Sequence, residues 1–438
     1  MINDGLNEFK GKRVLMLQGP VGPFFARFSA DLTLVGAVVF KVNFNGGDWL
    51  FSKSNSFSRV FNFTDELAAW PDYFDGLLQQ LNIDIVFLFG DCRPMHVAAL
   101  AVIRQRGLEA GVFEEGYIRP DYITLESNGV NNYSSLPSDP EFYLSHPRSQ
   151  IPTSKPLGST YWSATKWGGL YFAAASLASL KFRRYKHHRR LGFGDFPSWM
   201  HSYWRKFVYA ISERHTLPML VTANSGNFYL VALQTRGDSQ ISVHSDFESM
   251  ELFIEATVAS FAQHAPQDTI LALKHHPLDR GYSDYTRIVQ SLIQKYQLEG
   301  RCYYIHDQHL PTLLLHARGV VVVNSTVGLS AVGEGVPVKV CGHSIYDIEG
   351  LTFQGTLSEF WGNAHMAIPN SELYQAFKSY LISHTQHLGS FYKRLPEISY
   401  QSGVIWTNHE VPAPHRNAQT HKRKRSLANA IHSQSNTP

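Results

Sequence analysis

Short apolar runs alternate with amphipathic, helix-like stretches along most of this chain, and this alternation constrains the fold more than any other feature. Four consecutive valines at Val320–Val323 are the clearest apolar run. Runs of this kind are typical of strands that are buried on both faces of a parallel sheet. The alternation therefore predicts an α/β fold with doubly wound, parallel sheets. In the first part of the chain, the predicted strands are 13–19, 37–44, 84–90 and a run ending at Glu114, and the predicted helices are 24–35, 67–81 and 95–106.

The pattern occurs in two blocks, and a chain of 438 residues is too long for one ordinary core. We therefore expect an N-terminal Rossmann-like domain at 1–150 and a second one at 217–400, with a cleft between them. In the second block, Ser245 and Glu248 predict a capping box at the start of a helix over 245–264. The other predicted elements of this block are strands at 219–223, 228–234, 269–274, 302–306, 319–323 and 338–341 and helices at 285–296, 313–318, 325 onwards and 373–383.

Residues 151–216 interrupt the alternation with an aromatic and basic insert. Its most apolar stretch, Trp167–Leu180, has 14 residues, fewer than the roughly 18 that mark a membrane span. The basic cluster that follows favours contact with an anionic membrane surface, although a buried helix followed by a solvated helix face would show the same pattern. The basic and aromatic residues concerned are Lys181, Arg183, Arg184, Lys186, Arg189, Arg190, Trp199, Trp204, Arg205 and Lys206.

Composition narrows the class of protein further. Charged residues make up 17% of the chain, which argues against a disordered protein, and a net charge of +3 is too small for a dedicated nucleic-acid binder. The cysteines Cys92, Cys302 and Cys341 form no paired motif, which favours a reducing compartment. The N-terminus has no apolar signal region, so we expect a cytoplasmic protein. Residues 401–438 are polar and basic, and we expect them to be disordered.

Two acidic residues, Glu114 and Glu115, end a predicted buried strand, and Gly116 and Arg119 follow them. Carboxylates in such a place are costly to desolvate unless they are paired or used in chemistry. In an open α/β sheet, ligands bind beyond the carboxyl ends of the strands. This stretch is therefore the first candidate for a functional site.

Three motifs of the second block also follow predicted strands and carry side chains that can bind an anion or a sugar. One of them opens a predicted helix, whose N-terminus presents free N–H groups to a phosphate, although its residues are also ordinary helix caps. The other two could equally be a structural strand end and a polar turn. The candidate binding residues are Gln234, Asp238, Lys274, His276, Pro277, Asn324, Ser325 and Thr326.

Two segments of the first block carry further hydrogen-bonding groups. Gln18 precedes a turn at Gly19–Pro23 that matches neither common nucleotide-binding glycine motif. Asn43, Asn45 and Asp48 suit the hydroxyl groups of a sugar or glycerol, although a tight turn would explain the two glycines between them equally well. The sequence has no Asp-x-Asp motif, which favours a metal-independent enzyme or a donor with a single phosphate.

In their order along the chain, these segments resemble the KpsS/LipB family of capsular polysaccharide biosynthesis proteins. The resemblance runs from about residue 13 to residue 355 and leaves out the basic insert and the tail. It implies a GT-B-like architecture, in which two Rossmann-like domains face a central cleft. The matching segments are 17–23, 41–49, 113–120, 234–239, 274–277, 324–329 and 342–352.

The resemblance also implies an activity, namely transfer of the acidic sugar Kdo from CMP-Kdo to lyso-phosphatidylglycerol. The product is a β-linkage, formed with retention, that starts the linker of a capsular polysaccharide. The family's acidic-acidic-Gly motif falls on Glu114, Glu115 and Gly116, which gives Glu115 as the nucleophile and Glu114 as the fallback. The eight binding candidates of the second block would then hold the donor. The candidates for the acceptor or the cleft are Gln18, Asn43, Asn45, Asp48 and Arg119.

An enzyme of this kind needs no cofactor or metal besides its donor substrate. The resemblance places it at the cytoplasmic face of the inner membrane, peripherally bound, with an anionic phospholipid acceptor and other capsule assembly and export proteins, such as KpsC-like enzymes, as partners. Two alternatives stay open. One is a GT-B enzyme that uses a UDP-sugar or a CDP-polyol, and the other is a non-catalytic capsule assembly or export factor that binds a glycolipid.

Overall fold

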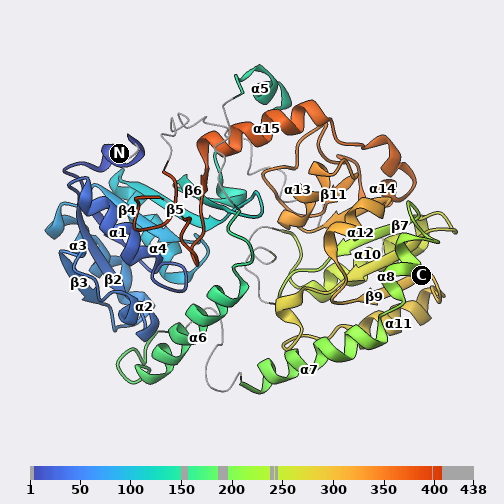
Figure 1. The fold of residues 1–438 in the computed structure, drawn as a ribbon, viewed down its shortest axis with the longest axis horizontal. Helices are drawn as coiled ribbons and strands as arrows, with labels where there is room; N and C mark the ends of the chain where they lie inside the picture. Colours follow the sequence, from blue (N-terminus) through green and yellow to red (C-terminus); the bar gives the residue numbers. More distant parts are fainter. Residues whose placement is uncertain are drawn as a thin grey trace. The chain divides into compact units, whose positions relative to one another are not determined.

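The computed structural model describes residues 4–148, 156–185, 196–236, 241, 245–396 and 398–406, and these form two compact α/β units. The first unit contains the described parts of Met1–Ser134, Ser145–Pro197 and Gln375–Val411. The second contains those of Ser135–Leu144 and Ser198–Tyr374. Figure 1 labels the elements of both units. Two α/β units with largely parallel sheets confirm the predicted fold class, whereas the predicted central cleft stays a prediction.

The first unit is built on a seven-stranded sheet with the order β12-β6-β5-β4-β1-β2-β3. Its central strands are parallel, but β6 is antiparallel to β5 and β12 is antiparallel to β6. The predicted parallel arrangement therefore holds for the central strands but not at this edge. The connection between β5 and β6 is too short for a helical crossover, so the chain can only turn back. The strands are β1 (Arg13–Met16), β2 (Val38–Asn43), β3 (Arg59–Asn62), β4 (Ile85–Phe89), β5 (Glu109–Glu115), β6 (Tyr122–Ser127) and β12 (Gln386–Leu388).

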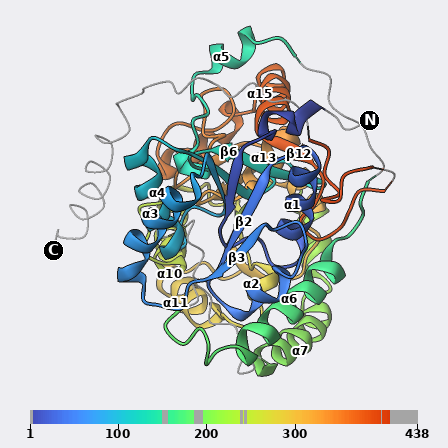
Figure 2. The ribbon, with the colours of Figure 1, turned by 90° about the vertical axis from the view of Figure 1, so that its left-hand side faces the viewer.

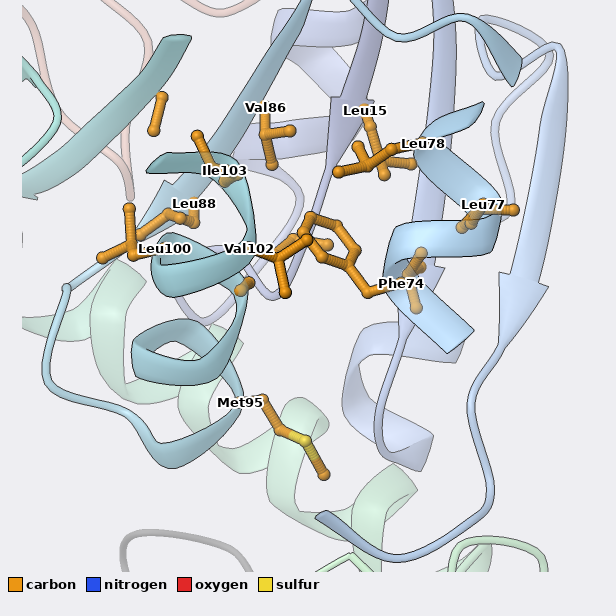
Figure 3. Packing of buried hydrophobic residues seen from close by; sticks show 14 of the residues in the cluster. Leu15, Phe74, Leu77, Leu78, Val86, Leu88, Met95, Leu100, Val102 and Ile103 are labelled. Carbon is orange, nitrogen blue, oxygen red and sulfur yellow. The ribbon is translucent and has the colours of Figure 1, made fainter. Parts of the chain in front are cut away.

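Both faces of this sheet are buried, as the apolar runs predict. On one face, Leu15, Val86 and Leu88 pack against Phe74 and Ile103, which come from the helices of that side (Figure 3). On the other face, the aromatic side chains of the first helix and of the chain's last described segment form a second cluster. The helices of the unit are α1 (Phe24–Leu34), α2 (Gly46–Phe51), α3 (Trp70–Leu81), α4 (Pro94–Arg106) and α6 (Tyr161–Leu177), and α15 (Ser371–His384) leads into β12.

The second unit has a five-stranded, fully parallel sheet with the order β11-β10-β7-β8-β9. Three of the four valines lie in β10, which is buried between two neighbouring strands, as predicted, and the fourth, Val323, directly follows it. The strands are β7 (Phe228–Ala232), β8 (Ile270–Lys274), β9 (Cys302–Ile305), β10 (Gly319–Val322) and β11 (Val338–Val340). The helices are α5 (Pro140–Ser145), α7 (Phe196–Ser212), α8 (Thr216–Val221), α10 (Met250–His264), α11 (Thr286–Tyr296), α12 (Leu310–His316), α13 (Thr326–Gly333) and α14 (Leu357–Asn363).

Two local predictions in the second unit were wrong. The strand predicted at 219–223 lies mostly within helix α8, because a short apolar run fits either type of element. The helix predicted from Ser245 begins at Met250, and its cap is Ser249, whose side chain accepts a hydrogen bond from Leu252 N at 3.3 Å. Ser249 therefore takes the role that the proposed capping box gave to Ser245.

The units divide the chain differently from the predicted boundaries. The described residues from Gln375 to Trp406 return to the first unit, because β12 adds to the edge of its sheet and Trp406 is buried in its core. The described part of the insert is shared, with α6 in the first unit and α7 in the second. Residues 186–195 of the insert and 407–438 of the tail lie outside the described residues. Among the described helices, none is long and apolar enough to span a bilayer.

Candidate functional site

The two acidic residues at the end of β5 occupy opposite faces of the sheet. Side chains alternate along a strand, and β5 continues through Glu115, so Glu114 shares a face with Val112, and Glu115 shares the other with Phe113. The contacts agree with this alternation. Val112 belongs to the cluster under α3 and α4, whereas Phe113 belongs to the aromatic cluster on the other side. The glutamates therefore have separate surroundings and need not share one role.

Glu115 is a carboxylate held from two sides. Its Oε1 accepts a hydrogen bond from the Tyr392 hydroxyl at 2.8 Å, and its Oε2 lies 3.2 Å from Arg119 Nη1. The side chain is still 31% exposed, so it remains accessible from solvent. A cation and a hydroxyl donor, one on each oxygen, fix the direction of the carboxyl group. Arg119, a predicted site residue, thus lies at Glu115 and orients it.

The turn after Glu115 is fixed by the strand that the chain adds at its end. Gln386 of β12 accepts hydrogen bonds through Oε1 from Tyr117 N at 2.9 Å and from Ile118 N at 3.5 Å. Only glycine fits at position 116, because a Cβ atom there would lie 2.2 Å from the carbonyl oxygen of Tyr122. The acidic-acidic-Gly motif therefore places a carboxylate at the start of a rigid, closely packed turn.

Glu114 lies in a different environment, facing the loop that follows β4. Its Oε1 accepts from Glu115 N at 3.0 Å, and a Cβ atom on Gly90 would lie 3.7 Å from its Oε2. The residue is half-buried, but its carboxyl group is withdrawn from water, and this desolvation raises the pKa of Glu114 to about 7. The charges of Glu115 and Asp91 raise the pKa further, and Arg93 opposes them. A carboxyl with this pKa can accept or donate a proton near neutral pH.

Glu114 also lies beside the topological switch point of the first sheet. The chain runs from β1 outward through β2 and β3 and then returns to β4 on the other side of β1. Such a reversal leaves a crevice beyond the carboxyl ends of the two strands, where α/β proteins bind ligands. Arg93, at the start of α4, crosses this point and donates through Nη1 to the carbonyl oxygen of Gly19 at 3.2 Å. The guanidinium group of Arg93 and the carboxyl group of Glu114 therefore both lie near the carboxyl ends of these strands.

The other candidates in the first unit are used by the protein itself. Tyr171 of α6 donates to Asp48 Oδ1 and accepts from Gln18 Nε2 and Asn45 Nδ2, each at 2.8 Å. Gln18, Asn45 and Asp48 are all buried. Asn43, also buried, donates to Ser52 Oγ at 3.0 Å and to Asn62 Oδ1 at 3.1 Å. These contacts give the four side chains a structural role, and their predicted role toward an acceptor stays a prediction.

The two glycines between Asn45 and Asp48 serve the same structural purpose. Gly46 and Gly47 begin α2, and the Asn45 side chain caps that helix through Gly47 N and Asp48 N. A Cβ atom on Gly46 would lie 2.2 Å from the carbonyl oxygen of Ala174, and one on Gly47 would lie 2.6 Å from the Tyr171 ring. Helices α2 and α6 therefore lie side by side in close contact (Figure 2). The close approach of α6 explains these glycines.

In the second unit, four candidates lie at the corresponding switch point. The chain leaves β7 toward β8 and β9 and later returns to β10 on the other side of β7. Gln234 follows β7 and Asn324 follows β10, and Gln234 Nε2 donates to Asn324 Oδ1 at 3.0 Å. Ser325 caps α13 and accepts from Val327 N at 3.3 Å, which leaves Thr326 as the first residue of that helix. The amides of Gln234 and Asn324 and the N-terminus of α13 thus lie together at a switch point, where α/β proteins bind ligands.

Most of the remaining candidates lie at the end of β8, the strand next to β7. Lys274 is buried and donates through Nζ to the carbonyl oxygen of His306 at 3.1 Å, and burial lowers its pKa. His276 caps the short turn that begins at Pro277, and its Nδ1 accepts from Leu278 N at 3.2 Å. Asp238 lies outside the described residues. Among the residues that the structure describes, no three His, Cys, Asp or Glu side chains gather as they would to hold a metal ion.

Comparison with known proteins decides the family. The family described as "Capsule polysaccharide biosynthesis protein" matches residues 84–392, more than half of the chain. The chain belongs to this family. The match begins at β4 and contains Glu114, Glu115 and every candidate of the second unit, and it includes the insert that the motif resemblance leaves out. Four candidates, Gln18, Asn43, Asn45 and Asp48, precede the matched residues.

Individual relatives support the assignment. The chain is 37% identical over 391 residues to the capsule polysaccharide export protein KpsS of Escherichia coli, an alignment that covers 87% of this chain and 97% of that protein. It is 38% identical over 391 residues to the capsule polysaccharide modification protein LipB of Neisseria meningitidis serogroup B, covering 88% of this chain and 92% of that protein. The predicted resemblance to the KpsS/LipB family is therefore confirmed.

Solved structures give only a distant likeness. Anabaena HepE in complex with UDP-glucose matches with a TM-score of 0.33 and 13% identity, over 85% of this chain and 94% of that one. The glycosyl transferase family 9 protein of Veillonella parvula matches with a TM-score of 0.23 and 9% identity, over 84% of this chain and 94% of that one. Because these TM-scores are low, the family assignment rests on the capsule protein relatives alone.

Three site residues of this capsule family member were missed by sequence reasoning. Arg93 could have been found, because it follows a predicted strand within Asp91-Cys92-Arg93-Pro94 and so stands where ligands bind. Tyr392 and Tyr171 gave no such signal. Tyr392 reaches Glu115 from 277 positions further along the chain, and Tyr171 reaches Asp48 from 123 positions away.

Proposed function

We propose that this protein is a retaining glycosyltransferase that moves Kdo from CMP-Kdo to lyso-phosphatidylglycerol and thereby starts the linker of a capsular polysaccharide. The observation that carries the proposal is the pair of unlike carboxyl groups at the end of β5. Glu115 is held by Arg119 and Tyr392, whereas Glu114 is desolvated and has a pKa of about 7. Retention by double displacement needs one carboxylate that attacks and a second group that handles a proton.

In the first step, the Glu115 carboxylate attacks the anomeric carbon of Kdo. The bond from that carbon to the phosphate oxygen of CMP breaks, and CMP leaves with the electron pair. The attack requires a carboxylate that points in one direction, and the Arg119 and Tyr392 contacts fix that direction. The product of this step is a Kdo ester of Glu115.

In the second step, a hydroxyl oxygen of the acceptor attacks the same carbon and releases the Glu115 carboxylate. The hydroxyl proton passes to the ionised Glu114 carboxylate. Two inversions at one carbon give net retention. Glu114 suits this role because a base works best when its pKa lies near the working pH.

The donor would bind at the switch point of the second unit. CMP-Kdo carries a phosphate and a sugar carboxylate, and both charges are suited to the N-terminus of α13 and to Lys274. Gln234 and Asn324 would hold polar groups of the cytidine or of Kdo through the amide atoms that they now offer each other. His276, Ser325 and Thr326 complete this proposed donor site, and Asp238 and Pro277 belong to the same strand-end motifs.

We further propose a cytoplasmic location with peripheral attachment to the inner membrane, where the lipid acceptor lies, and cooperation with KpsC-like enzymes. A second candidate function is capsule export without catalysis, which the name of the relative KpsS, an export protein, favours. The name of the relative LipB, a modification protein, favours chemistry on the polysaccharide or its lipid.

The test uses a Glu115→Gln variant, which keeps the size of the side chain and removes its charge. We expect transfer to fall by a factor on the order of 10³ or more, because the attacking group is lost. Binding of CMP-Kdo, measured by calorimetry, should remain. The matched control is Glu109→Gln, which changes the exposed glutamate at the other end of the same strand and should leave transfer unchanged.

Mass spectrometry separates the possible outcomes. The native protein incubated with CMP-Kdo alone should carry one Kdo, and the Glu115→Gln variant should carry none. Undiminished transfer by this variant would remove Glu115 from the nucleophile role. A native protein that binds the glycolipid but never transfers Kdo would favour the export factor.

A further inference from the structure

Helix α7 packs against the second unit with its polar side. The residues on its less exposed side are Ser198, Ser202, Arg205, Tyr209 and Glu213, the last of which directly follows the helix. Their spacing of three to four residues defines one face of a helix. A helix of a globular protein normally turns its apolar face inward, so α7 is inverted.

Specific contacts fix this orientation. Arg205 donates through Nη1 to the carbonyl oxygens of Arg280 at 2.9 Å and Ser283 at 3.2 Å, and it pairs with Asp284. Glu213 accepts through Oε2 from His306 N at 3.0 Å and bonds the His306 ring through Oε1. A helix held by charged groups near its middle and just beyond its end cannot rotate to hide its other face without breaking these contacts.

Close packing adds a second restraint. Arg280 Nε donates to the carbonyl oxygen of Ser202 at 2.9 Å. A Cβ atom on Gly281 would lie 2.2 Å from the carbonyl oxygen of Ser198, so only glycine permits this approach. The Tyr209 ring stacks on His306 with 3.5 Å between centroids. The polar face of α7 is therefore a fitted contact, along the edge of the unit that Figure 1 shows.

The opposite face of α7 is apolar and open to solvent. The spacing of its members, three, one, three, one and three residues, again describes one helical stripe. The exposed residues are Met200 at 54%, Tyr203 at 62%, Trp204 at 67%, Phe207 at 51%, Val208 at 40% and Ile211 at 68%. A contiguous stripe with this much exposed aromatic surface marks a contact site.

Charge indicates what covers the stripe. Helix α7 contains no acidic residue, and its exposed basic side chain is Lys206, with His201 on one flank and Arg214 two residues beyond the helix end. The nearby acids, Glu213 and Asp284, are already paired with His306 and Arg205. Tyrosine and tryptophan beside lysine are typical of helices that lie at the headgroup level of a bilayer. An anionic lipid surface complements both the apolar and the basic side chains.

We propose that the outward stripe of α7 is a membrane-docking surface that lies in the interface of an anionic bilayer. This deepens the peripheral attachment proposed above and rests on it, but it does not depend on the transfer chemistry. It assigns docking to six named side chains of one helix. The helix lies in the plane of the membrane, with its polar face still bound to the second unit.

The test measures sedimentation of the full chain with vesicles of equal parts phosphatidylglycerol and phosphatidylcholine. The native protein should bind, and Ile211→Asp and Trp204→Asp should each weaken binding about tenfold or more, because a charge enters the apolar stripe. Lys206→Glu should weaken binding to these vesicles but not to pure phosphatidylcholine. The matched control is Leu315→Asp, at a leucine of the same unit that is 64% exposed, and it should bind like the native protein.

The outcomes are distinct. Absent vesicle binding, or equal binding by all variants, overturns the proposal. A native protein that forms a dimer in solution and becomes a monomer on Ile211→Asp also overturns it, because a second copy then covers the stripe. Unchanged circular dichroism of the variants confirms that they fold. Their transfer to a water-soluble lyso-phospholipid should equal that of the native protein, so failure of docking and failure of the transferase assignment are separable.

Discussion

In both sheets, similar polar residues follow the carboxyl ends of the parallel strands, but the two units use them differently. We call this end of each sheet its edge. In the first unit, Gln18, Asn45 and Asp48 bond to Tyr171 and hold helix α6 in place. In the second unit, Gln234 Nε2 donates to Asn324 Oδ1 across the switch point, next to the N-terminus of α13. Similar polar motifs after strands can thus anchor a helix or offer a ligand site. What distinguishes the first set is its contact with Tyr171 of α6, a helix from a distant part of the chain.

At the first edge, the exception is the side toward β4 and β5, where Glu114 and Arg93 lie. Arg93 reaches across to Gly19, and Glu114 faces the same loop. The edge is therefore divided into a structural half beside β2 and a half with reactive groups beside β5. Two changes test this division, and a third tests the contrast with the second unit, from the largest expected effect to the smallest.

The largest effect is expected from Glu114→Gln on the reactive half. If Glu114 accepts the acceptor's proton, the variant should lose transfer by about 10²–10⁴-fold. The pKa of Glu114 is raised to about 7 by desolvation, so the carboxylate base is present above that pH and lost as the pH falls through it. The kcat/KM of the native protein for the acceptor should therefore rise with pH up to about 7 and then level.

The Glu114→Gln variant should lose this dependence on pH, because its amide does not titrate. The variant should still react with CMP-Kdo and carry a covalently bound Kdo, since that first step uses Glu115. A variant that keeps the native pH profile would show that another group supplies the base, and the reactive half would lose its assignment.

The second effect is expected from Gly46→Ala on the structural half. The new methyl group would meet the backbone of α6, which cannot move as a side chain can. We expect unfolding free energy to fall by about 1–3 kcal/mol. Chemical denaturation followed by circular dichroism measures this change.

The control for that change is Gly169→Ala in α6, where a Cβ atom would meet nothing within 4 Å. It should leave stability unchanged or raise it by up to about 1 kcal/mol, because alanine favours the helix. Equal losses from both variants would mean that the contact between α2 and α6 is not the reason for the glycine.

The contrast between the edges also shows what sequence can predict. The valine run predicts β10, which contains three of its residues, because adjacent apolar residues fit a strand buried on both sides. The opposite directions of Glu114 and Glu115 follow from strand periodicity once β5 is known to continue through both residues. Both inferences need only local pattern.

Local pattern does not predict which side chains from distant segments make contact. The three residues of β12 are too few to predict as a strand, yet Gln386 fixes the turn after Glu115 from 269 positions away. Tyr171 stands in an apolar helix that the sequence marks for a membrane or a core, and only the fold shows that its hydroxyl joins Asp48. The side chains that decide whether a strand end is structural or open therefore came from distant segments.

The smallest effect is expected from Asn324→Ala at the second edge. If this edge is open to the donor, the variant loses one neutral hydrogen-bonding group toward CMP-Kdo, which is worth about 1 kcal/mol or roughly fivefold in affinity. Calorimetric titration with CMP-Kdo measures this change. Ser330→Ala, one turn further along α13, should bind the donor normally. If Asn324→Ala instead lowers stability and leaves donor affinity intact, the second edge is structural like the first, and the contrast between them fails.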